Sequence, residues 1–219
     1  MTTQRDSTTE PIAGRLAVGL AKLGLAARHR AWEGATRAGL TPTQGQILAY
    51  LLNHPEGARP GEISEALGVT AATVSDSAAA LATKGYLSRA SDPTDKRAVR
   101  LVLTDVGKDV AAAAAQWSDV LLAAVDALAP EEQIVLLRSI IKMIRALQIR
   151  GAIPIARMCV NCQYFRPYAH RDALRPHHCA FVNAPFGDAD LRIDCSDFIA
   201  SREEERGLAW ARFSSGAAG

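Results

Sequence analysis

The feature that most constrains this chain is the placement of its cysteines. All four lie in the last third of the 219-residue sequence, in the order C-x2-C-x16-C-x15-C, and residues 1–158 contain none. They are Cys159, Cys162, Cys179 and Cys195. A tight pair can hold one side of a metal centre while two distant thiolates close the other side. The spacing therefore predicts a metal site in the C-terminal segment.

The composition is that of a globular protein, with 48% hydrophobic and 22% charged residues. No apolar run reaches the length of a membrane span and residues 1–10 are polar, so we expect a cytoplasmic protein without a membrane partner. Thiols stay reduced in that compartment, which disfavours disulfides. A net charge of only +2 means that any affinity for nucleic acid must come from local basic patches.

The composition changes near residue 150. Gly151 and Pro154 mark a break, and aromatic residues concentrate after it. The length allows one ordinary domain and a smaller one. We expect a disordered N-terminus at residues 1–10, a first domain at 11–150, a four-cysteine module at 151–200 and a charged, flexible tail at 201–219.

The first domain begins with helices that have clear start and stop signals. Apolar residues at helical spacing predict a long helix over residues 11–37. Thr41-Pro42-Thr43-Gln44 combines an N-cap, a proline at the first helical position and a capping box. A short helix ending at Gly68 and a second one from Thr70 to Gly85 then predict a helix-turn-helix, whose second helix enters the major groove of DNA.

A hairpin and two further helices complete the pattern. Segments 86–90 and 98–103 alternate as strands around a charged turn, which predicts a wing after the helix-turn-helix. Residues 104–128 form a long helical pattern, and a last helix opens at Pro130 and carries an apolar stripe at Ile134, Leu137, Ile141 and Ile144. Such stripes indicate a helical dimer interface. The predicted fold class is therefore mainly α with a small β-wing, namely a winged helix-turn-helix with a helical dimerisation region and a small irregular four-cysteine module.

These motifs resemble the MarR family of winged-helix transcription regulators over roughly residues 10–150. The resemblance rests on residues 40–44, 65–70 and 73–75, and above all on Asp95-Lys96-Arg97 followed by Leu103-Thr104-x-x-Gly107. It implies a homodimer on a pseudo-palindromic operator in double-stranded DNA, with recognition helices in successive major grooves and wings in the flanking minor grooves. It also implies a small-molecule effector bound between the dimer helices and the winged helix.

The candidate DNA-binding residues lie on the second helix and the wing: Thr70, Ala72, Thr73, Asp76, Ser77, Arg89, Lys96 and Arg97. Asp76 departs from the family, in which a basic residue is common here; a carboxylate accepts from cytosine N4 but repels phosphate. Thr70 serves equally as an N-cap, and the other polar positions of the helix equally as solvated surface. We expect Asp95 to brace the hairpin and Arg97 to share that role with a minor-groove contact. Lys96 and Arg89 are expected to face phosphates, although solvated surface is the commoner environment of a lysine.

Three interpretations compete for the four cysteines. Four thiolates suit a structural zinc ion, and His170, His177 or His178 could replace one of them, but a zinc ribbon usually has a second tight pair. An iron–sulfur cluster is larger than one ion, so dispersed cysteines suit it better. Four unliganded cysteines in a small core are least favoured, because free cysteines rarely concentrate in one segment with a C-x2-C pair. His177 and His178 are adjacent and cannot both face the site, and which of them does so, if either, is left open.

A second resemblance supports the cluster. Cys159 to Phe165, His178 to Phe181 and Cys195 to Phe198 resemble the cluster-binding core of high-potential iron–sulfur proteins over about residues 157–199. The last interval is longer by about two residues, and Asp194 and Phe198 stand where that family has tryptophans. The resemblance implies a [4Fe–4S] cluster. A dry shell for it is expected from the neighbouring aromatic residues Tyr164, Phe165, Phe181, Phe186 and Phe198.

The sequence thus predicts a DNA-binding transcription regulator whose C-terminal cluster senses redox or oxygen. One alternative is a regulator with a structural zinc site that responds to a small-molecule ligand. Another is a redox carrier that uses the DNA-binding part only for localisation. We expect no enzyme, because the chain shows no Ser/His/Asp set, no phosphate-binding glycine loop and no paired carboxylates suited to a cleft.

Overall fold

The computed structural model describes residues 11–115 and 119–216. Contacts between residues divide the chain into two compact units. The first unit comprises residues 1–63 and 69–127, and the second comprises residues 128–219 together with 64–68. The disorder expected for residues 1–10 lies outside the described residues, as do residues 116–118 of the helical pattern expected over 104–128.

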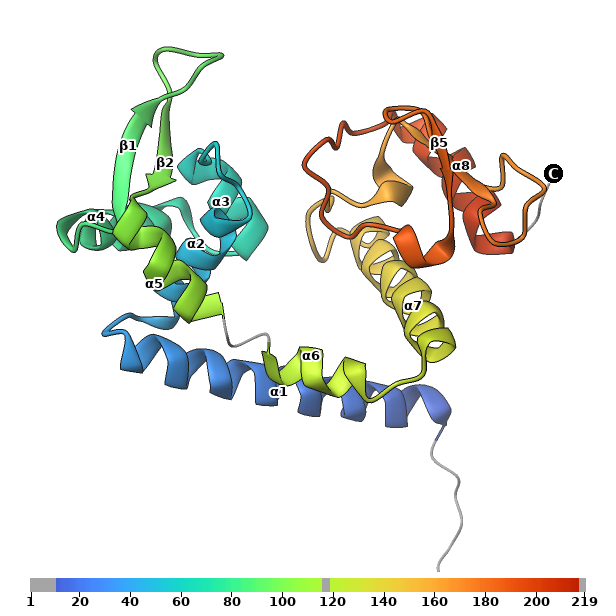
Figure 1. Cartoon of the computed structure of the whole chain (residues 1–219), viewed down its shortest axis with the longest axis horizontal. Coiled ribbons are helices and arrows are strands. Elements are labelled where there is room, and N and C mark those ends of the chain that lie inside the picture. Colours follow the sequence, from blue (N-terminus) through green and yellow to red (C-terminus); the bar gives the residue numbers. More distant parts are fainter. Residues whose placement is uncertain (1–10, 116–118, 217–219) are drawn as a thin grey trace, which may run out of the picture. The chain divides into compact units, whose positions relative to one another are not determined.

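The first unit is mainly helical with one small antiparallel hairpin (Figure 1). Its elements in chain order are α1 (Ile12–Arg37), α2 (Pro42–Leu52), α3 (Pro60–Leu67), α4 (Ala71–Thr83), β1 (Leu87–Ser91), β2 (Val99–Leu103), α5 (Asp105–Ala115) and α6 (Asp119–Asp126). The predicted N-caps of α2 and α4 are both confirmed. The Thr41 hydroxyl accepts from the Gln44 N–H at 3.3 Å, and the Gln44 side chain accepts from the Thr41 N–H at 3.2 Å. The Thr70 hydroxyl accepts from the Thr73 N–H at 3.1 Å.

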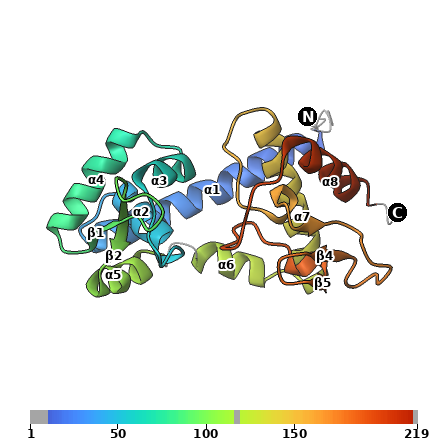
Figure 2. The same ribbon diagram turned by 90° about the horizontal axis from the view of Figure 1, so that it is seen from above.

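The predicted helix-turn-helix and wing are present. Helix α4 buries Val74, Ala78 and Leu81, the three residues that the sequence places on its inner face, and it packs beside α2 (Figure 2). Strands β1 and β2 pair in register from Leu87 opposite Leu103 to Ser91 opposite Val99. A buried apolar core joins these elements and packs the hairpin, which follows α4 in the chain, against the helices.

The wing is held by one buried carboxylate. Asp92 is 1% exposed and forms ion pairs with Arg59 at 2.8 Å and with Arg100 at 3.5 Å. Its other oxygen accepts from the N–H and hydroxyl of Thr94 and from the N–H of Asp95. The hydrogen bond from Arg59, followed by those from Thr94 and Asp95, holds the pKa of Asp92 well below its usual range. One side chain thus closes the turn and ties it to the residue that precedes α3.

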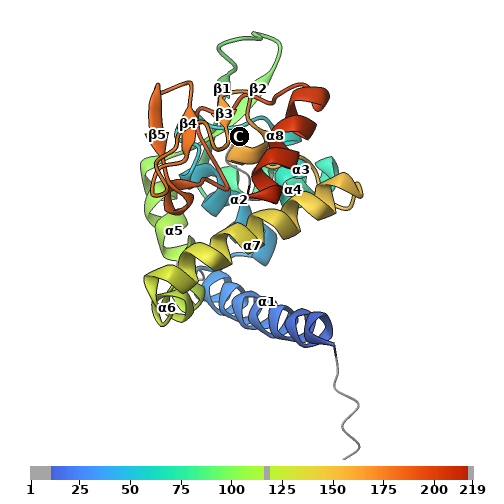
Figure 3. The ribbon, with the colours of Figure 1, turned by 90° about the vertical axis from the view of Figure 1, so that its right-hand side faces the viewer.

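The long helix expected over residues 104–128 appears as two elements, α5 and α6, with residues 116–118 outside the described chain. The turn into α5 is tight: a Cβ at Gly107 would lie 1.9 Å from the Tyr86 carbonyl oxygen, so only glycine fits there. Helix α6 packs along α1, as Figure 1 and Figure 3 both show.

The second unit combines two helices with short segments of sheet. Its elements are α7 (Pro130–Ile149), the 3₁₀ turn η2 (Cys159–Asn161), β3 (Phe165–Arg166), β4 (His177–Cys179), β5 (Ala184–Phe186), the 3₁₀ turn η3 (Asp188–Asp190) and α8 (Glu203–Ser215). The three strands form one antiparallel sheet in the order β3-β4-β5 (Figure 3). Helix α8 replaces part of the flexible tail expected at residues 201–219, and it is anchored by Phe213, which is fully buried.

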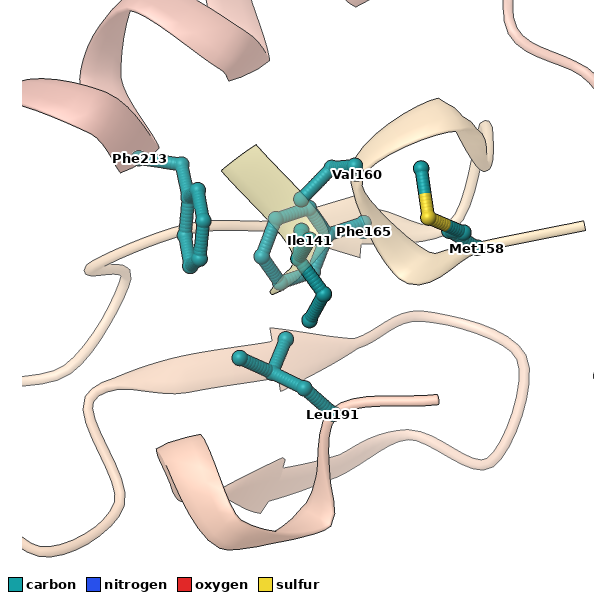
Figure 4. Close-up of a cluster of buried hydrophobic side chains, with 6 residues drawn as sticks. All are labelled: Ile141, Met158, Val160, Phe165, Leu191 and Phe213. Carbon is teal, nitrogen blue, oxygen red and sulfur yellow. The ribbon is translucent and has the colours of Figure 1, made fainter. Parts of the chain in front are cut away.

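Helix α7 belongs to the core of the second unit. Six buried side chains converge there from α7, from η2 and the residue before it, from β3, from the segment after η3 and from α8 (Figure 4): Ile141, Met158, Val160, Phe165, Leu191 and Phe213. Leu137 and Ile144, which the sequence assigns with Ile141 to a dimer interface, pack against this cluster. The reason is geometric, because these three residues share the helix face that the cysteine segment covers. The unit therefore begins with α7, about twenty residues before the boundary expected at residue 150.

A search for long apolar helices in the described part of the chain finds none that could cross a lipid bilayer.

Ile141→Ala should destabilise the second unit by about 2–5 kcal/mol, because it leaves a cavity in a closely packed cluster. Val135→Ala is the matched control, since Val135 lies on the same helix and is 64% exposed; its effect should stay within about 0.5 kcal/mol. Native-state hydrogen exchange of amides in residues 158–213 measures the difference. Equal effects of the two changes would contradict the assignment of α7 to this core.

Asp92→Asn should speed amide exchange in the turn at residues 93–98, because it removes the charge that pairs with Arg59 and Arg100. The pKa of Asp92 is lower in the folded state than in the unfolded state. The extra stability that the ionised carboxylate gives the wild-type turn is therefore fully present above the unfolded-state pKa of about 3.9, and it is lost as the pH falls below that value towards the folded-state pKa. The gap between the two proteins should therefore narrow from about pH 5 to about pH 3. Asp105→Asn, at an exposed ion pair with Lys108, is the control and should leave the turn unchanged.

Candidate DNA-binding surface and metal centre

Helix α4 presents an exposed or half-buried face of small and polar residues next to its buried face. Ala72 and Asp76 are exposed, and Thr73 and Ser77 are half-buried on the same side. Thr70 is exposed, and its hydroxyl caps the helix and also lies 2.8 Å from the Thr73 hydroxyl. The N-terminal end of α4 thus offers short hydroxyl and methyl groups, the kind of surface that enters a major groove without steric conflict.

The exposed cations of the wing do not pair with Asp92, the buried carboxylate that holds the turn. Arg89, Lys96 and Arg97 are all exposed, and their side chains make no ion pair among the described residues. The Asp95 carboxylate accepts from the Arg97 N–H at 3.0 Å, so Asp95 braces the hairpin through the backbone and leaves the Arg97 guanidinium free of that role. Three free cations on one hairpin form a local basic patch in a nearly neutral chain.

Sequence reasoning missed the role of Asp92. Its partners Arg59 and Arg100 lie 33 residues before it and eight residues after it, and no local pattern links them. A partial signal was present, because Asp-Pro-Thr is typical of a turn in which aspartate accepts from the N–H two residues on. That signal could have identified the turn, but not the arginine pairs.

In the second unit, one cavity brings the four cysteines together. Cys159, Cys162, Cys179 and Cys195 all line a cavity of about 450 Å³. They come from three pieces of backbone: Cys159 and Cys162 from η2 and the residue after it, Cys179 from the end of β4, and Cys195 from the loop before Phe198. The fold thus collects residues that are up to 36 positions apart in the sequence.

Backbone hydrogen bonds fix the two ends of this set. The Cys159 N–H donates to the Arg192 carbonyl at 3.1 Å, and the Arg192 N–H donates to the Cys159 sulfur at 3.3 Å. The Cys195 carbonyl accepts from Nε and Nη2 of Arg157 at 3.0 and 2.7 Å, and the Cys195 N–H donates to the Arg157 carbonyl at 3.1 Å. Arg192 therefore positions Cys159, the first cysteine, and Arg157 positions Cys195, the last.

The cysteine geometry differs from that of a single-ion site. Four thiolates at about 2.3 Å from one zinc ion must lie within about 4 Å of one another. Among the described residues, no three His, Cys, Asp or Glu side chains come close enough to hold one ion. All four cysteines line one cavity, and a donor set of four thiols is compatible with a group larger than one ion.

Burial changes the chemistry of one thiol. Removal from water raises the pKa of Cys159 to about 11, with a smaller contribution from the other three cysteines nearby. A thiol in such a place is protonated at neutral pH unless a bound cation stabilises the thiolate. The N–H group of Arg192 is the only backbone donor to this sulfur in the described chain.

Aromatic rings make up much of the cavity wall. Tyr164, Phe165, Phe181 and Phe186 line it, as expected, and the rings of Tyr164 and Phe181 lie 5.4 Å apart. Phe198 is half-buried but is not part of the wall. Four charged residues also line the cavity, namely Arg175, Asp190, Arg192 and Asp197, so the aromatic rings shield a bound group from water on part of the wall only.

Neither of the two adjacent histidines lines the cavity. Both ring nitrogens of His177 have partners, since Nδ1 accepts from the Tyr168 N–H at 3.3 Å and Nε2 donates to Asp188 at 2.9 Å. Burial lowers the pKa of His177, against the opposing effect of Asp188. His178 contacts the ring of His170 at 3.2 Å. The histidines thus support the fold around the cavity.

Comparison with known proteins relates the first unit to a family. Residues 38–98 match the model of the MarR family, and no curated protein matches the chain. MepR of S. aureus in its DNA-binding conformation is 25% identical, with a TM-score of 0.55 over 60% of this chain and 98% of that one. A mutant MepR from a multidrug-resistant S. aureus clinical isolate is also 25% identical, with a TM-score of 0.50 over 60% and 96%.

A MepR–DNA complex from S. aureus is 24% identical, with a TM-score of 0.51 over 60% of this chain and 97% of that one, and it shares the fold. The family match covers α2, α3, α4 and most of the wing, and ends before the first cysteine. The likeness to the MarR family therefore lies in the winged helix-turn-helix, and the four-cysteine cavity lies outside the family match.

Proposed function

We propose that this protein is a DNA-binding transcription regulator of the MarR type whose second unit holds an iron–sulfur cluster, most simply [4Fe–4S], that senses redox or oxygen. The four cysteines are its ligands, and the face of α4 with the wing is its DNA-binding surface. The observation that carries the proposal is the single cavity lined by all four cysteines, in a chain whose first unit has the MarR-type fold.

The DNA-binding part is supported by surface chemistry and by similarity. The outer face of α4 and the cations of the wing have no partners within the described chain that would compete with DNA. MepR, which shares the fold, has been solved with DNA. Recognition by such a domain uses short side chains at base edges and arginine or lysine at phosphates and the minor groove. The target is a pseudo-palindromic operator in double-stranded DNA.

A homodimer is supported by the apolar surface of α1. Ile12, Leu16, Leu20 and Leu23 recur at helical spacing and are between 40% and 68% exposed. A stripe of this kind in a soluble protein marks an interaction surface, and a second copy of the chain is the partner that a two-fold operator requires. Helix α6 packs beside α1 and adds Leu122, which is also exposed.

The metal part is supported by the donor set and the cavity wall. Four sulfurs around one space, an N–H group aimed at Cys159 and a wall of aromatic rings are the features that hold and tune an iron–sulfur cluster. When bound, such a cluster supplies one-electron redox chemistry. The chain contributes the thiolates, shields part of the cavity with aromatic rings and positions Cys159 and Cys195 through Arg192 and Arg157.

Two alternatives differ in what the second unit does. A structural zinc ion would require the sulfurs to move closer together, and the regulator would then answer to a small-molecule effector. A redox carrier would bind DNA equally well with and without the cluster, whereas a sensor would not. The same purified protein distinguishes them through its metal content and its DNA affinity in the two states.

Lys96→Ala should lower the salt dependence of DNA binding by about one unit in the log–log slope, because it removes one phosphate contact. Arg97→Ala should weaken binding as well. A duplex of mixed sequence is the probe, and affinity is measured at several salt concentrations. Lys22→Ala, which removes an exposed cation from α1, is the control and should leave the slope unchanged. An unchanged slope in a Lys96→Ala, Arg97→Ala double variant would contradict the assignment of the wing.

Serine in place of any one of the four cysteines should abolish or strongly impair retention of the cluster, because an open ligand position exposes it to solvent. His178→Ala should retain it, since His178 does not line the cavity. Anaerobic purification followed by visible absorbance and assays of iron and acid-labile sulfide measures retention. Full iron content in the cysteine variants, or dependence on His178, would overturn the cluster assignment.

A further inference from the structure

The second unit contains a buried polar network that neither the DNA-binding surface nor the cavity uses directly. Its centre is His177, which is fully buried, with both ring nitrogens engaged. Because Nδ1 accepts from the Tyr168 N–H, the proton is on Nε2 and is donated to Oδ1 of Asp188. This arrangement fixes the orientation of the ring.

Arg138 extends the network onto α7. Its guanidinium forms an ion pair with Oδ2 of Asp188 and donates to the Tyr168 hydroxyl at 3.0 Å. The same group lies 4.9 Å from the centre of the Phe213 ring. One side chain of α7 therefore contacts η3, the loop after β3 and α8 at once.

The other end of the network lies at the cavity wall. His177 and Cys179 are two residues apart on β4, so their side chains leave the strand on the same face. Phe186 pairs with His177 across the sheet and Phe165 pairs with Cys179, and both rings line the cavity. These two rings lie 5.5 and 5.4 Å from the His177 ring. A shift of β4 at Cys179 therefore carries His177 with it.

Separating these groups is unfavourable. Removing the partner of a largely buried guanidinium or carboxylate costs far more free energy than breaking an exposed ion pair, because the buried charge is left without compensation. Arg138 and Asp188 are only 21% and 25% exposed at the side chain. Helix α7 and β4 are therefore expected to move together or to remain in place together.

We propose that Arg138, Asp188 and His177 couple the occupancy of the four-cysteine cavity to the state of α7, so that binding or loss of the group held there changes the order of this helix. The coupling rests on the proposed function, because it needs the cysteines to hold a group. It extends that function by naming the residues through which the second unit responds. Its carrier is the set of hydrogen bonds among Arg138, Asp188, His177 and Tyr168, which either persists as a whole or breaks as a whole.

The test compares amide exchange of α7 peptides, residues 130–149, in the full-length protein before and after anaerobic loading with iron and sulfide. Wild type should show exchange that is about fivefold or more slower on loading. Arg138→Gln and Asp188→Asn should load iron to within about twofold of wild type and show little change in α7. Lys142→Gln removes the same charge from an exposed position of α7 and should respond like wild type. Two variants are used so that a folding defect in one leaves the other to decide.

The outcomes separate the two ideas. A wild-type response in either loaded and folded network variant would overturn the coupling and leave the cluster assignment standing. Loss of iron from both network variants, with helix content intact, would also overturn it, because the network would then hold the cavity without linking it to α7. Failure of the wild type to take up iron and sulfide would overturn the proposed function, and the coupling with it.

Discussion

The hydrophobic cluster around Ile141 is the contact on which the second unit depends. The cysteine segment has only three short strands and two 3₁₀ turns of its own, too little regular structure to bury a core. Helix α7 supplies the surface that this segment covers, and α8 closes the other side with Phe213. Without that packing, Phe165 would lose its support, and with it the wall that brings Cys179 towards the other cysteines.

The same helix carries two surfaces with different tasks. Its inner face, at Leu137, Ile141 and Ile144, packs into the cysteine unit, while Val135 and Met143 remain exposed on another side. Arg138 lies between the inner face and the exposed side of the helix, and it belongs to the polar network with Asp188. In the proposed regulator, a helix that is both core and surface is a suitable place for a signal to leave the second unit, because a change in the order of the helix alters the surface that it exposes.

Local signals predicted the first unit well, because α2 and α4 begin with capping threonines and α4 is followed by a glycine with positive φ. Thr41, Thr70 and Gly85 could be placed from the sequence alone, and so could the buried face of α4. The segment that packs against α7 could not be predicted in this way, because an apolar stripe shows that a helix face is covered but does not show which segment covers it. The four cysteines were singled out from their spacing, and the fold places all four along one cavity; that they bind a metal stays a prediction.

Other features depended on contacts far apart in the sequence. The pairing of Asp92 with Arg59 joins residues 33 positions apart, and that of Arg138 with Asp188 joins residues 50 apart. Helix α8 has a weak pattern, with three glutamates in its first turn and one fully buried residue, and it therefore resembled a solvated tail. In each case the missing information was tertiary, since the local sequence permits the element but does not require it.

The most direct test of the account is the metal and sulfide content of the wild-type protein purified without oxygen. A four-cysteine cavity that holds a cubane should yield about four iron atoms and about four sulfides per chain, with little zinc. One zinc ion per chain, with no acid-labile sulfide, would contradict the account.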